Sequence, residues 1–388
     1  MRSFPLRYAR RGVSHGLFAV MLLLTLGSVG APVLAAVGPG REPGPAVTAG
    51  AAVLMEAASG QVLWQKNAYQ PRPPASTTKI VTAVLATEIA DRQGVVTTSE
   101  LAASVGGSSI YLRAGEKLTV AEMLQGALLE SGNDAAQALA EHVAGSDELF
   151  AWLMNQKVRL DAGVGSHFVN PHGLPHPAHR TTAYDLARVA RDALQDPFLA
   201  SVVRTRQATI PWPGYQWPRV LHNTNQLLGR YPGADGVKTG TTGEAGQCLV
   251  ASATRNGRQL IAVVLRSYDR YGDAVRLLDY GFASLALYRR PAASLTRQVA
   301  VTGGRRSELT VSNSQPLLYT VPPGADSHAE WYFHLPREIP APVARGEILG
   351  WVEVAWQGWP LDYSPLAAAE DVSRRRWRLN SPLPTGNR

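Results

Sequence analysis

The sequence predicts a mixed α/β (α+β) fold, in which helices flank an antiparallel sheet and a helical block is inserted between its strands. A small all-β domain follows. Two observations support this prediction. Strand-like runs occur at both ends of residues 49–290 and amphipathic helical runs lie between them, whereas residues 291–372 contain only short alternating runs. We therefore expect a first domain over residues 49–290 and a small β-sandwich-like domain over residues 291–372.

The first domain begins with two short apolar runs that predict a hairpin at a sheet edge. Residues 51–57 (AAVLMEA) and 61–67 (QVLWQKN) are separated by Ala-Ser-Gly, a typical turn sequence. A second hairpin is predicted for residues 248–255 and 258–266, because Asn256-Gly257 between them is the strongest short hairpin signal.

Helices are predicted wherever apolar residues recur at positions i, i+3 and i+4. The pattern occurs in residues 76–90, 119–145, 182–196 and 274–287, and Thr181 or Thr182 is expected to cap the third of these helices. In the second domain, short alternating runs predict strands; they are residues 297–303, 307–313, 316–322, 329–335 and 347–356.

The amino terminus has the features of a signal peptide over residues 1–35. Arg2, Arg7, Arg10 and Arg11 precede the apolar stretch 16–30, and small residues offer a cleavage site after Ala35. An uncleaved membrane anchor is the alternative interpretation. Removal of the segment implies an exported, extracytoplasmic protein, with residues 36–48 as a Pro/Gly-rich linker.

The positive charge is concentrated at the two ends of the chain. Of the formal charge of +8, four Arg lie in residues 1–35 and five in the tail 373–388, so residues 36–372 carry −1. This distribution argues against a nucleic-acid partner. We expect the tail to be disordered; contact of its arginines with anionic lipid stays an open alternative.

The single cysteine, Cys248, excludes an intramolecular disulfide. It lies in an apolar strand-like run, so we expect a buried structural thiol rather than a nucleophile.

Ser76 and Lys79 are the first pair of residues that could perform chemistry. Three positions apart on a helix, their side chains share one face, and apolar neighbours would lower the pKa of the lysine so that its neutral amine accepts the serine proton. Pro73 and Pro74 precede them and leave free N–H groups near Ser76, where an oxyanion could be held. Taken alone, the pattern is common and more often reflects a capping serine and a surface lysine.

Two further short motifs bring polar groups to turns or strand ends. Ser131-Gly132-Asn133 interrupts a helical pattern, which fits either a proton relay and amide-binding pair or a simple helix end and cap. Lys238-Thr239-Gly240 lies where a strand should begin, and Gly240 allows close approach of a ligand to the backbone. A lysine and a threonine there suit a carboxylate; a loop with a solvated lysine is the alternative.

In their order, and with gaps of about 55 and 105 residues, the three motifs resemble those of the penicillin-interacting serine acyl-transferases. The chain is most similar to the low-molecular-mass D-alanyl-D-alanine carboxypeptidases, a class of penicillin-binding protein. The resemblance extends from about residue 48 to residue 288 and rests on the stretches 71–83, 128–136, 167–174, 179–190 and 236–253. Residues 345–354 also resemble the family's C-terminal module. The implied fold of the first domain is that of the serine β-lactamases and transpeptidases.

The resemblance implies a role for each matching residue. Ser76 would be acylated, Lys79 would be its base, and Ser131 would pass a proton to the leaving D-alanine. Asn133 would hold the substrate amide. The terminal carboxylate would bind Lys238 and Thr239 of the Lys238-Thr239-Gly240 motif, and the backbone N–H groups of Ser76 and Thr241 would form the oxyanion hole. Arg266 and Arg270 would add positive charge near the carboxylate.

The expected activity is removal of the terminal D-alanine from peptidoglycan stem peptides, and β-lactam antibiotics should trap the same serine. We expect no cofactor. We also expect no metal, since His167, His172, His176 and His179 lack a matching set of ligands. One alternative is a serine β-lactamase, which would need a dedicated glutamate that we do not find in residues 167–182. The other is a catalytically silent wall-binding scaffold, which would normally have lost one of the catalytic residues.

Overall fold

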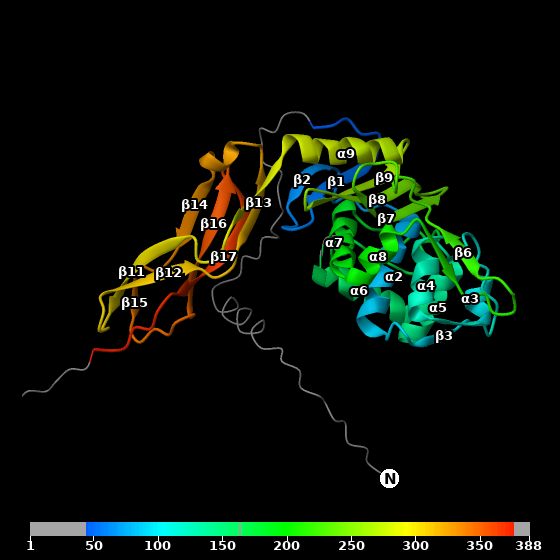
Figure 1. Cartoon of the computed structure of the whole chain (residues 1–388), viewed down its shortest axis with the longest axis horizontal. Helices are drawn as coiled ribbons and strands as arrows, with labels where there is room; N and C mark the ends of the chain where they lie inside the picture. The colour runs from blue at the N-terminus through cyan, green and yellow to red at the C-terminus, as the bar shows by residue number, and fades with distance from the viewer. Residues whose placement is uncertain (1–43, 162, 164, 376–388) are drawn as a thin grey trace, which may run out of the picture. The chain divides into compact units, whose positions relative to one another are not determined.

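The computed structural model describes residues 44–161, 163 and 165–375 (Figure 1). The predicted signal peptide (residues 1–35), most of the linker and all but three residues of the basic tail lie outside the described residues. Within this part of the chain, no helix is both long enough and apolar enough to cross a membrane.

A five-stranded antiparallel sheet forms the centre of the first domain. In spatial order its strands are β2 (Val62–Lys66), β1 (Ala51–Glu56), β9 (Arg258–Ser267), β8 (Gly246–Arg255) and β7 (Ala234–Thr242). Both predicted hairpins are present: β1 pairs with β2, and β8 turns into β9 at Asn256-Gly257. Because β7 is the last strand, one of its edges has no partner strand within the sheet.

The helices lie on both faces of this sheet and in a block between β2 and β7. They are α2 (Lys79–Ile89), α3 (Glu100–Ser104), α4 (Val120–Leu128), α5 (Asn133–Ala144), α6 (Asp147–Asp161), α7 (Ala183–Gln195), α8 (Pro197–Arg204) and α9 (Arg270–Ser284), with the 3-10 turn η1 (Ala75–Thr78). A second 3-10 turn, η2 (Ala325–His328), lies in the later part of the chain. Helix α9 covers one face, and α2, α7 and α8 lie on the other (Figure 1). Leu277 and Leu278 of α9 pack against Leu54, Leu249 and Val264 of the strands, in a fully buried core.

Local sequence explains where the helices start and stop. Thr119 and Glu122 form a reciprocal capping box at the start of α4, and Thr182, one of the two predicted caps, accepts a hydrogen bond from the Asp185 N–H at the start of α7. The long pattern over residues 119–145 is broken, as predicted, at Ser131-Gly132, where Ser131 adopts a positive φ of 65°. Two short antiparallel strand pairs, neither of which was predicted, complete this domain. Strand β3 (Val95–Thr97) pairs with β4 (Lys117–Thr119), with α3 between them in the chain, and β5 (Gln207–Ile210) forms a hairpin with β6 (Arg219–His222).

The remaining part of the chain is all-β apart from η2. A six-stranded sheet has the order β14 (Glu330–His334), β16 (Ile348–Trp356), β17 (Trp359–Ala368), β12 (Glu308–Asn313), β11 (Thr296–Thr302) and β15 (Glu338–Pro340). Strands β10 (Ala286–Arg290) and β13 (Leu317–Val321) form a separate pair. The expected boundary at residue 290 therefore falls after β10, which already pairs with a strand of the second part. Strands β10, β15 and β17 were not predicted.

Candidate active site

Ser76 lies in a short, constrained turn at the start of helix α2. Residues Ala75–Thr78 form the 3-10 turn η1, and Ala75 has a positive φ of 49°. The hydroxyls of Thr77 and Thr78 donate hydrogen bonds back to the carbonyls of Pro74 (2.7 Å) and Ala75 (2.8 Å). These bonds fix the backbone on both sides of Ser76, whose own side chain is only partly buried.

Lys79 points its amine at the Ser76 hydroxyl from within the protein interior. Its Nζ atom lies 3.0 Å from Ser76 Oγ, 2.6 Å from Asn133 Oδ1 and 2.9 Å from the carbonyl oxygen of His172. The side chain is fully buried. Burial, reinforced by the charge of Lys238, holds the pKa of Lys79 well below its usual range. The predicted juxtaposition of the serine hydroxyl and a lysine whose pKa is lowered by burial is therefore present.

The turn between α4 and α5 brings Ser131 and Asn133 into the same region. The Asn133 Nδ2 donates to the carbonyl of Gly106 at 2.6 Å, while its Oδ1 accepts from Lys79. The oxygen and the nitrogen of the Asn133 carboxamide, which we expected to hold a substrate amide, are thus both hydrogen-bonded within the protein. One N–H of the side-chain amide is left as a donor for a ligand. The hydroxyl of Ser131, a residue only 5% exposed, has no hydrogen-bond partner among the described residues.

The Lys238-Thr239-Gly240 sequence lies in the middle of edge strand β7, not at its start, because pairing with β8 already begins at Ala234. Lys238 is 1% exposed and Thr239 6%. Burial, followed by the charge of Arg270, lowers the pKa of Lys238 to about 7. The Thr239 hydroxyl lies 2.6 Å from that of Thr224.

Gly240 lies where strand β7 meets the turn that contains Ser76. A Cβ at this position would come within 3.0 Å of both the Ser76 nitrogen and the Pro74 carbonyl oxygen. Any side chain would therefore push the strand away from the turn, so glycine is needed for this close approach.

Arg270 lies at the same end of β7, as the sequence analysis suggested. Its guanidinium donates to the Thr241 hydroxyl at 2.8 Å and to the Gly240 carbonyl at 3.1 Å. Glu130, which the sequence analysis did not single out, has the opposite electrostatic effect on the pKa of Lys238. For Arg266, the other arginine considered, the structure shows a positive φ of 52° near the end of β9 and gives no contact with Thr241.

The loop after α6 supports the serine turn through groups that no motif predicts. The His172 carbonyl accepts from Lys79, and Gly173 packs so closely that a Cβ there would lie 1.9 Å from the Ala75 oxygen. His179 Nε2 lies 2.9 Å from the Thr78 hydroxyl, while its Nδ1 accepts from the Val169 N–H. Burial lowers the pKa of His172 and of His179 to about 3, so both imidazoles are neutral at physiological pH.

Comparison with known proteins identifies the family. The family model for D-alanyl-D-alanine carboxypeptidases matches residues 39–268. The chain belongs to this family. It is 36% identical to the D-alanyl-D-alanine carboxypeptidase DacF of Bacillus subtilis over 83% of this chain and 85% of that protein. It is 33% identical to DacC of Escherichia coli, over 84% and 85%.

Solved structures of D-alanyl-D-alanine carboxypeptidase-family proteins have the same fold. Penicillin-binding protein 5 of Haemophilus influenzae superposes with a TM-score of 0.75 at 30% identity, covering 86% of this chain and all of that one. A Streptomyces K15 DD-transpeptidase variant gives a TM-score of 0.59 at 32% identity, covering 62% of this chain and 99% of the other. The predicted family and fold class are both confirmed.

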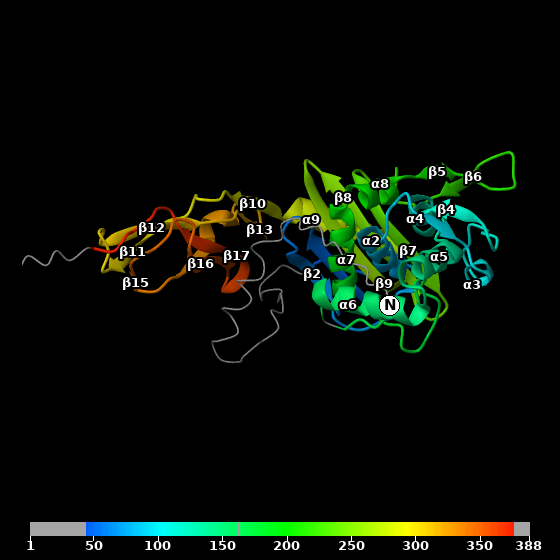
Figure 2. The same ribbon diagram turned by 90° about the horizontal axis from the view of Figure 1, so that it is seen from below.

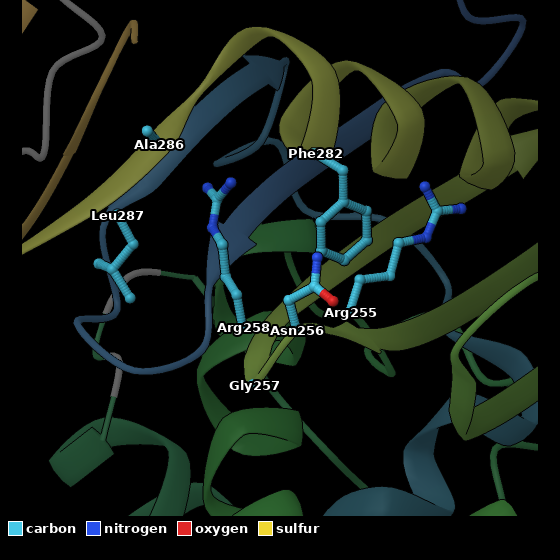
Figure 3. A pocket seen from close by; sticks show the side chains of 7 residues that line it. All are labelled: Arg255, Asn256, Gly257, Arg258, Phe282, Ala286 and Leu287. Carbon is cyan, nitrogen blue, oxygen red and sulfur yellow. The ribbon is translucent and has the colours of Figure 1, made fainter. Parts of the chain in front are cut away.

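A further hollow in this carboxypeptidase-family chain lies at the turn of the β8–β9 hairpin (Figure 3). Phe282 of α9 lies between the side chains of Arg255 and Arg258, whose guanidinium carbons are 4.7 and 5.9 Å from the ring centroid. Neither Ser76, Lys79 nor Lys238 lines this hollow, so it is separate from the candidate active site.

Proposed function

We propose that this chain is a serine DD-carboxypeptidase that removes the terminal D-alanine from peptidoglycan stem peptides through an acyl-enzyme on Ser76. The observation that supports this most directly is the 3.0 Å contact between Lys79 Nζ and Ser76 Oγ. The other two partners of the lysine are neutral oxygen acceptors, and its pKa is depressed by burial. A neutral amine at this distance is able to take the serine proton.

Acylation then follows from the positions of the surrounding groups. The Ser76 proton moves to Lys79 as Oγ attacks the carbonyl carbon of the scissile peptide bond. The backbone N–H groups of Ser76 and Thr241 would hold the oxyanion, an arrangement that typically contributes about 100- to 1,000-fold in rate per donor. As the C–N bond breaks, the Ser131 hydroxyl would relay the proton from the Lys79 ammonium to the departing D-alanine nitrogen, which returns Lys79 to its neutral form, and water would later hydrolyse the ester.

We assign recognition of the substrate's C-terminal carboxylate to residues of strand β7 and to Arg270. Lys238 and Thr239 are neighbours in β7, and the charge of Arg270, which donates to the Thr241 hydroxyl, acts on Lys238. We expect the ammonium, the hydroxyl and the guanidinium to contribute to one carboxylate site. A terminal carboxylate satisfies all three, whereas an internal peptide bond would leave buried positive charge unpaired. This difference favours carboxypeptidase activity over cleavage within a chain.

We expect the enzyme to act outside the cytoplasm, because assembled peptidoglycan lies there. Export through the predicted signal peptide is part of this proposal, and contact of the basic tail with a membrane surface stays an open alternative to a solvated tail. Both rest on residue types in the terminal segments.

A β-lactamase would need rapid hydrolysis of the acyl-enzyme. Within the described part of the chain, no carboxylate hydrogen bonds to Ser76 or Lys79, so a dedicated base for that step is not in place. We therefore expect β-lactams to form a long-lived adduct.

A fluorescent penicillin tests the proposal on the intact protein. Wild-type protein should be labelled covalently, and Ser76→Ala and Lys79→Ala should not be, while circular dichroism and thermal melting show that both variants fold. Release of D-alanine from a pentapeptide ending in D-Ala-D-Ala should follow the same pattern. A labelled Ser76→Ala variant would assign the acyl group elsewhere, and the absence of D-alanine release by wild type that has not been treated with penicillin would favour the scaffold alternative.

A further inference from the structure

An eight-residue aromatic loop connects β5 to β6 and extends from the helical part of the first domain (Figure 2). Residues 211–218 read PWPGYQWP, without a single charged side chain. Trp217 is 59% exposed and Tyr215 37%. A shallow hollow is lined by seven of the eight residues of the loop, Gly214 excepted. Exposed aromatic surface of this kind commonly marks a binding site.

The three rings of the loop form one stepped surface, which we call the aromatic step (Trp212, Tyr215 and Trp217). The Trp212 and Tyr215 ring centroids are 4.4 Å apart at an interplanar angle of 40°, and those of Tyr215 and Trp217 are 5.6 Å apart at 44°. Three aromatic rings that lie next to one another at these tilts suit a ligand built of successive rigid rings rather than one flat aromatic molecule.

The aromatic step is held from beneath by two arginines. The Arg219 guanidinium carbon lies 4.9 Å from the Trp212 centroid, and Arg219 is itself paired with Glu116 at 2.9 Å, with both side chains almost fully buried. Arg113 lies 4.9 Å from the Tyr215 centroid and donates to the Tyr215 hydroxyl. Rings fixed in this way lose little conformational freedom when a ligand binds, which favours affinity.

Two short stretches of chain connect the aromatic step to the candidate active site. Strand β6 leads directly to Thr224, whose hydroxyl lies 2.6 Å from that of Thr239. On the other side, Arg113 follows the segment whose Gly106 and Ser108 carbonyls accept hydrogen bonds from Asn133. The loop is therefore anchored to both walls of the site through short stretches of chain.

We propose that the aromatic step binds the glycan strand of peptidoglycan while a stem peptide from that strand occupies the active site. The proposal rests on the proposed function, because it names the polymeric form of the same substrate. Pyranose rings present flat C–H faces that stack on Trp and Tyr, whose rings combine an apolar face with a polar edge. Gln216 and the Trp217 indole N–H are available to the sugar hydroxyls.

The lengths of the stem peptide and of the protein segment between the aromatic step and the active site are compatible with glycan binding at the aromatic step. Four stem-peptide residues between the glycan and the scissile bond span at most about 14 Å, and the seven residues from Trp217 to Thr224 at most about 25 Å. A glycan strand continues in both directions from each peptide, so sugar rings are able to reach the loop while the peptide bond lies at Ser76. A membrane surface is the competing ligand, but the loop has no basic residue to complement anionic lipid.

The experiment compares Trp217→Ala and Tyr215→Ala with wild type on a free pentapeptide and on insoluble peptidoglycan that carries pentapeptides. Trp152→Ala is the matched control, because Trp152 is 55% exposed on α6, remote from the loop in sequence. We expect kcat/KM for the free peptide and the rate of penicillin labelling to change less than twofold in all variants. D-alanine release from the polymer should fall about 3- to 10-fold in the two loop variants alone, the size expected for one lost ring contact. The Trp217→Tyr variant should retain most of the wild-type rate of D-alanine release from the polymer.

A binding measurement separates this inference from the proposed function. Co-sedimentation of each variant with peptidoglycan stripped of its peptides does not need catalysis, so it reports on the aromatic step even if the protein releases no D-alanine. Equal sedimentation of Trp217→Ala and wild type would overturn the inference. So would an equal loss on free peptide and polymer, which indicates damage to the peptide site, or a Trp217-dependent binding to anionic phospholipid vesicles without binding to glycan.

Discussion

Lys79 and Asn133 are joined by a 2.6 Å hydrogen bond between Nζ and Oδ1, across 54 positions of sequence and inside the protein. An uncharged acceptor at this short distance orients the amine toward Ser76 and stabilises the protonated amine less than a carboxylate would. Asparagine at position 133 is therefore compatible with the pKa of Lys79, which burial and the charge of Lys238 hold well below its usual range.

Replacing this acceptor with a carboxylate should change the pH dependence of acylation. In Asn133→Asp, a negative charge next to Lys79 should raise the pKa of the lysine, because an opposite charge stabilises the protonated amine. The acid limb of the penicillin acylation rate should move to higher pH. Asn133→Ala should slow acylation at every pH by about 10-fold or more, since the amine loses orientation, but should leave the limb close to its wild-type position. Coincident profiles for wild type and Asn133→Asp would contradict this account.

Lys238 should set the alkaline limb of kcat/KM for carboxylate-terminated peptides. Its pKa of about 7 in the free enzyme means that the ammonium is present below pH 7 and lost above it. Since kcat/KM reports groups of the free enzyme, its value should fall as pH rises through about 7. The limb in kcat should lie at higher pH, because the bound carboxylate restores the charge.

The neighbour that lowers this pKa provides the control. Removing the Arg270 charge in Arg270→Gln should raise the pKa of Lys238 and shift the kcat/KM limb to higher pH, even if overall activity falls. An unshifted limb would assign the alkaline ionisation to a different group.

Thr78 links a buried histidine to the turn that carries the nucleophile. Because the Val169 N–H donates to His179 Nδ1, the imidazole proton must lie on Nε2, which donates to Thr78; the Thr78 hydroxyl in turn donates to the Ala75 carbonyl. In Thr78→Val this chain is broken and two buried polar groups lose a partner. We expect a loss of about 1–3 kcal/mol in the free energy of unfolding and slower acylation. Thr78→Ser keeps the hydroxyl and should retain both the stability and the acylation rate, measured by denaturant unfolding and penicillin labelling. Equal defects in Thr78→Ser and Thr78→Val would argue against the hydrogen-bond chain.

Gly173 should not tolerate even one added methyl group. It has a φ of 87°, and its Cβ would lie 1.9 Å from the Ala75 oxygen, so Gly173→Ala must displace the Ser76 turn. We expect a lower melting temperature together with a large loss of acylation rate. Gly243→Ala is the control, since Gly243 has open space around its Cβ position and no positive φ; a Gly173→Ala variant as active and stable as Gly243→Ala would show that the close packing is not required.

Local sequence was sufficient for the elements whose signals are periodic or depend on turn chemistry. The Asn256-Gly257 hairpin, the break at Ser131-Gly132 and the cap at Thr182 all lie where short-range rules put them. Segments with weaker periodicity, such as helix α6 and strand β17, were missed. The hairpin β5–β6 was also missed, because its two strands of four residues are separated by an eight-residue loop rich in proline and tryptophan.

The sequence likewise predicted only part of the candidate site. The sequence by itself determined which side chains are candidates for the site. Ser76, Lys79, Ser131, Asn133, Lys238 and Thr239 occur in motifs whose order and spacing resemble those of the penicillin-interacting serine acyl-transferases. Only the tertiary structure decided what surrounds them: the His172 carbonyl on Lys79, the His179 imidazole on Thr78, Gly173 against Ala75, and the use of both ends of the Asn133 amide. Backbone carbonyls are the same in every residue, so no sequence pattern marks the one that will receive a hydrogen bond. That choice depends on the path of the chain between segments about 50 to 100 residues apart, and it is fixed only when the core packs.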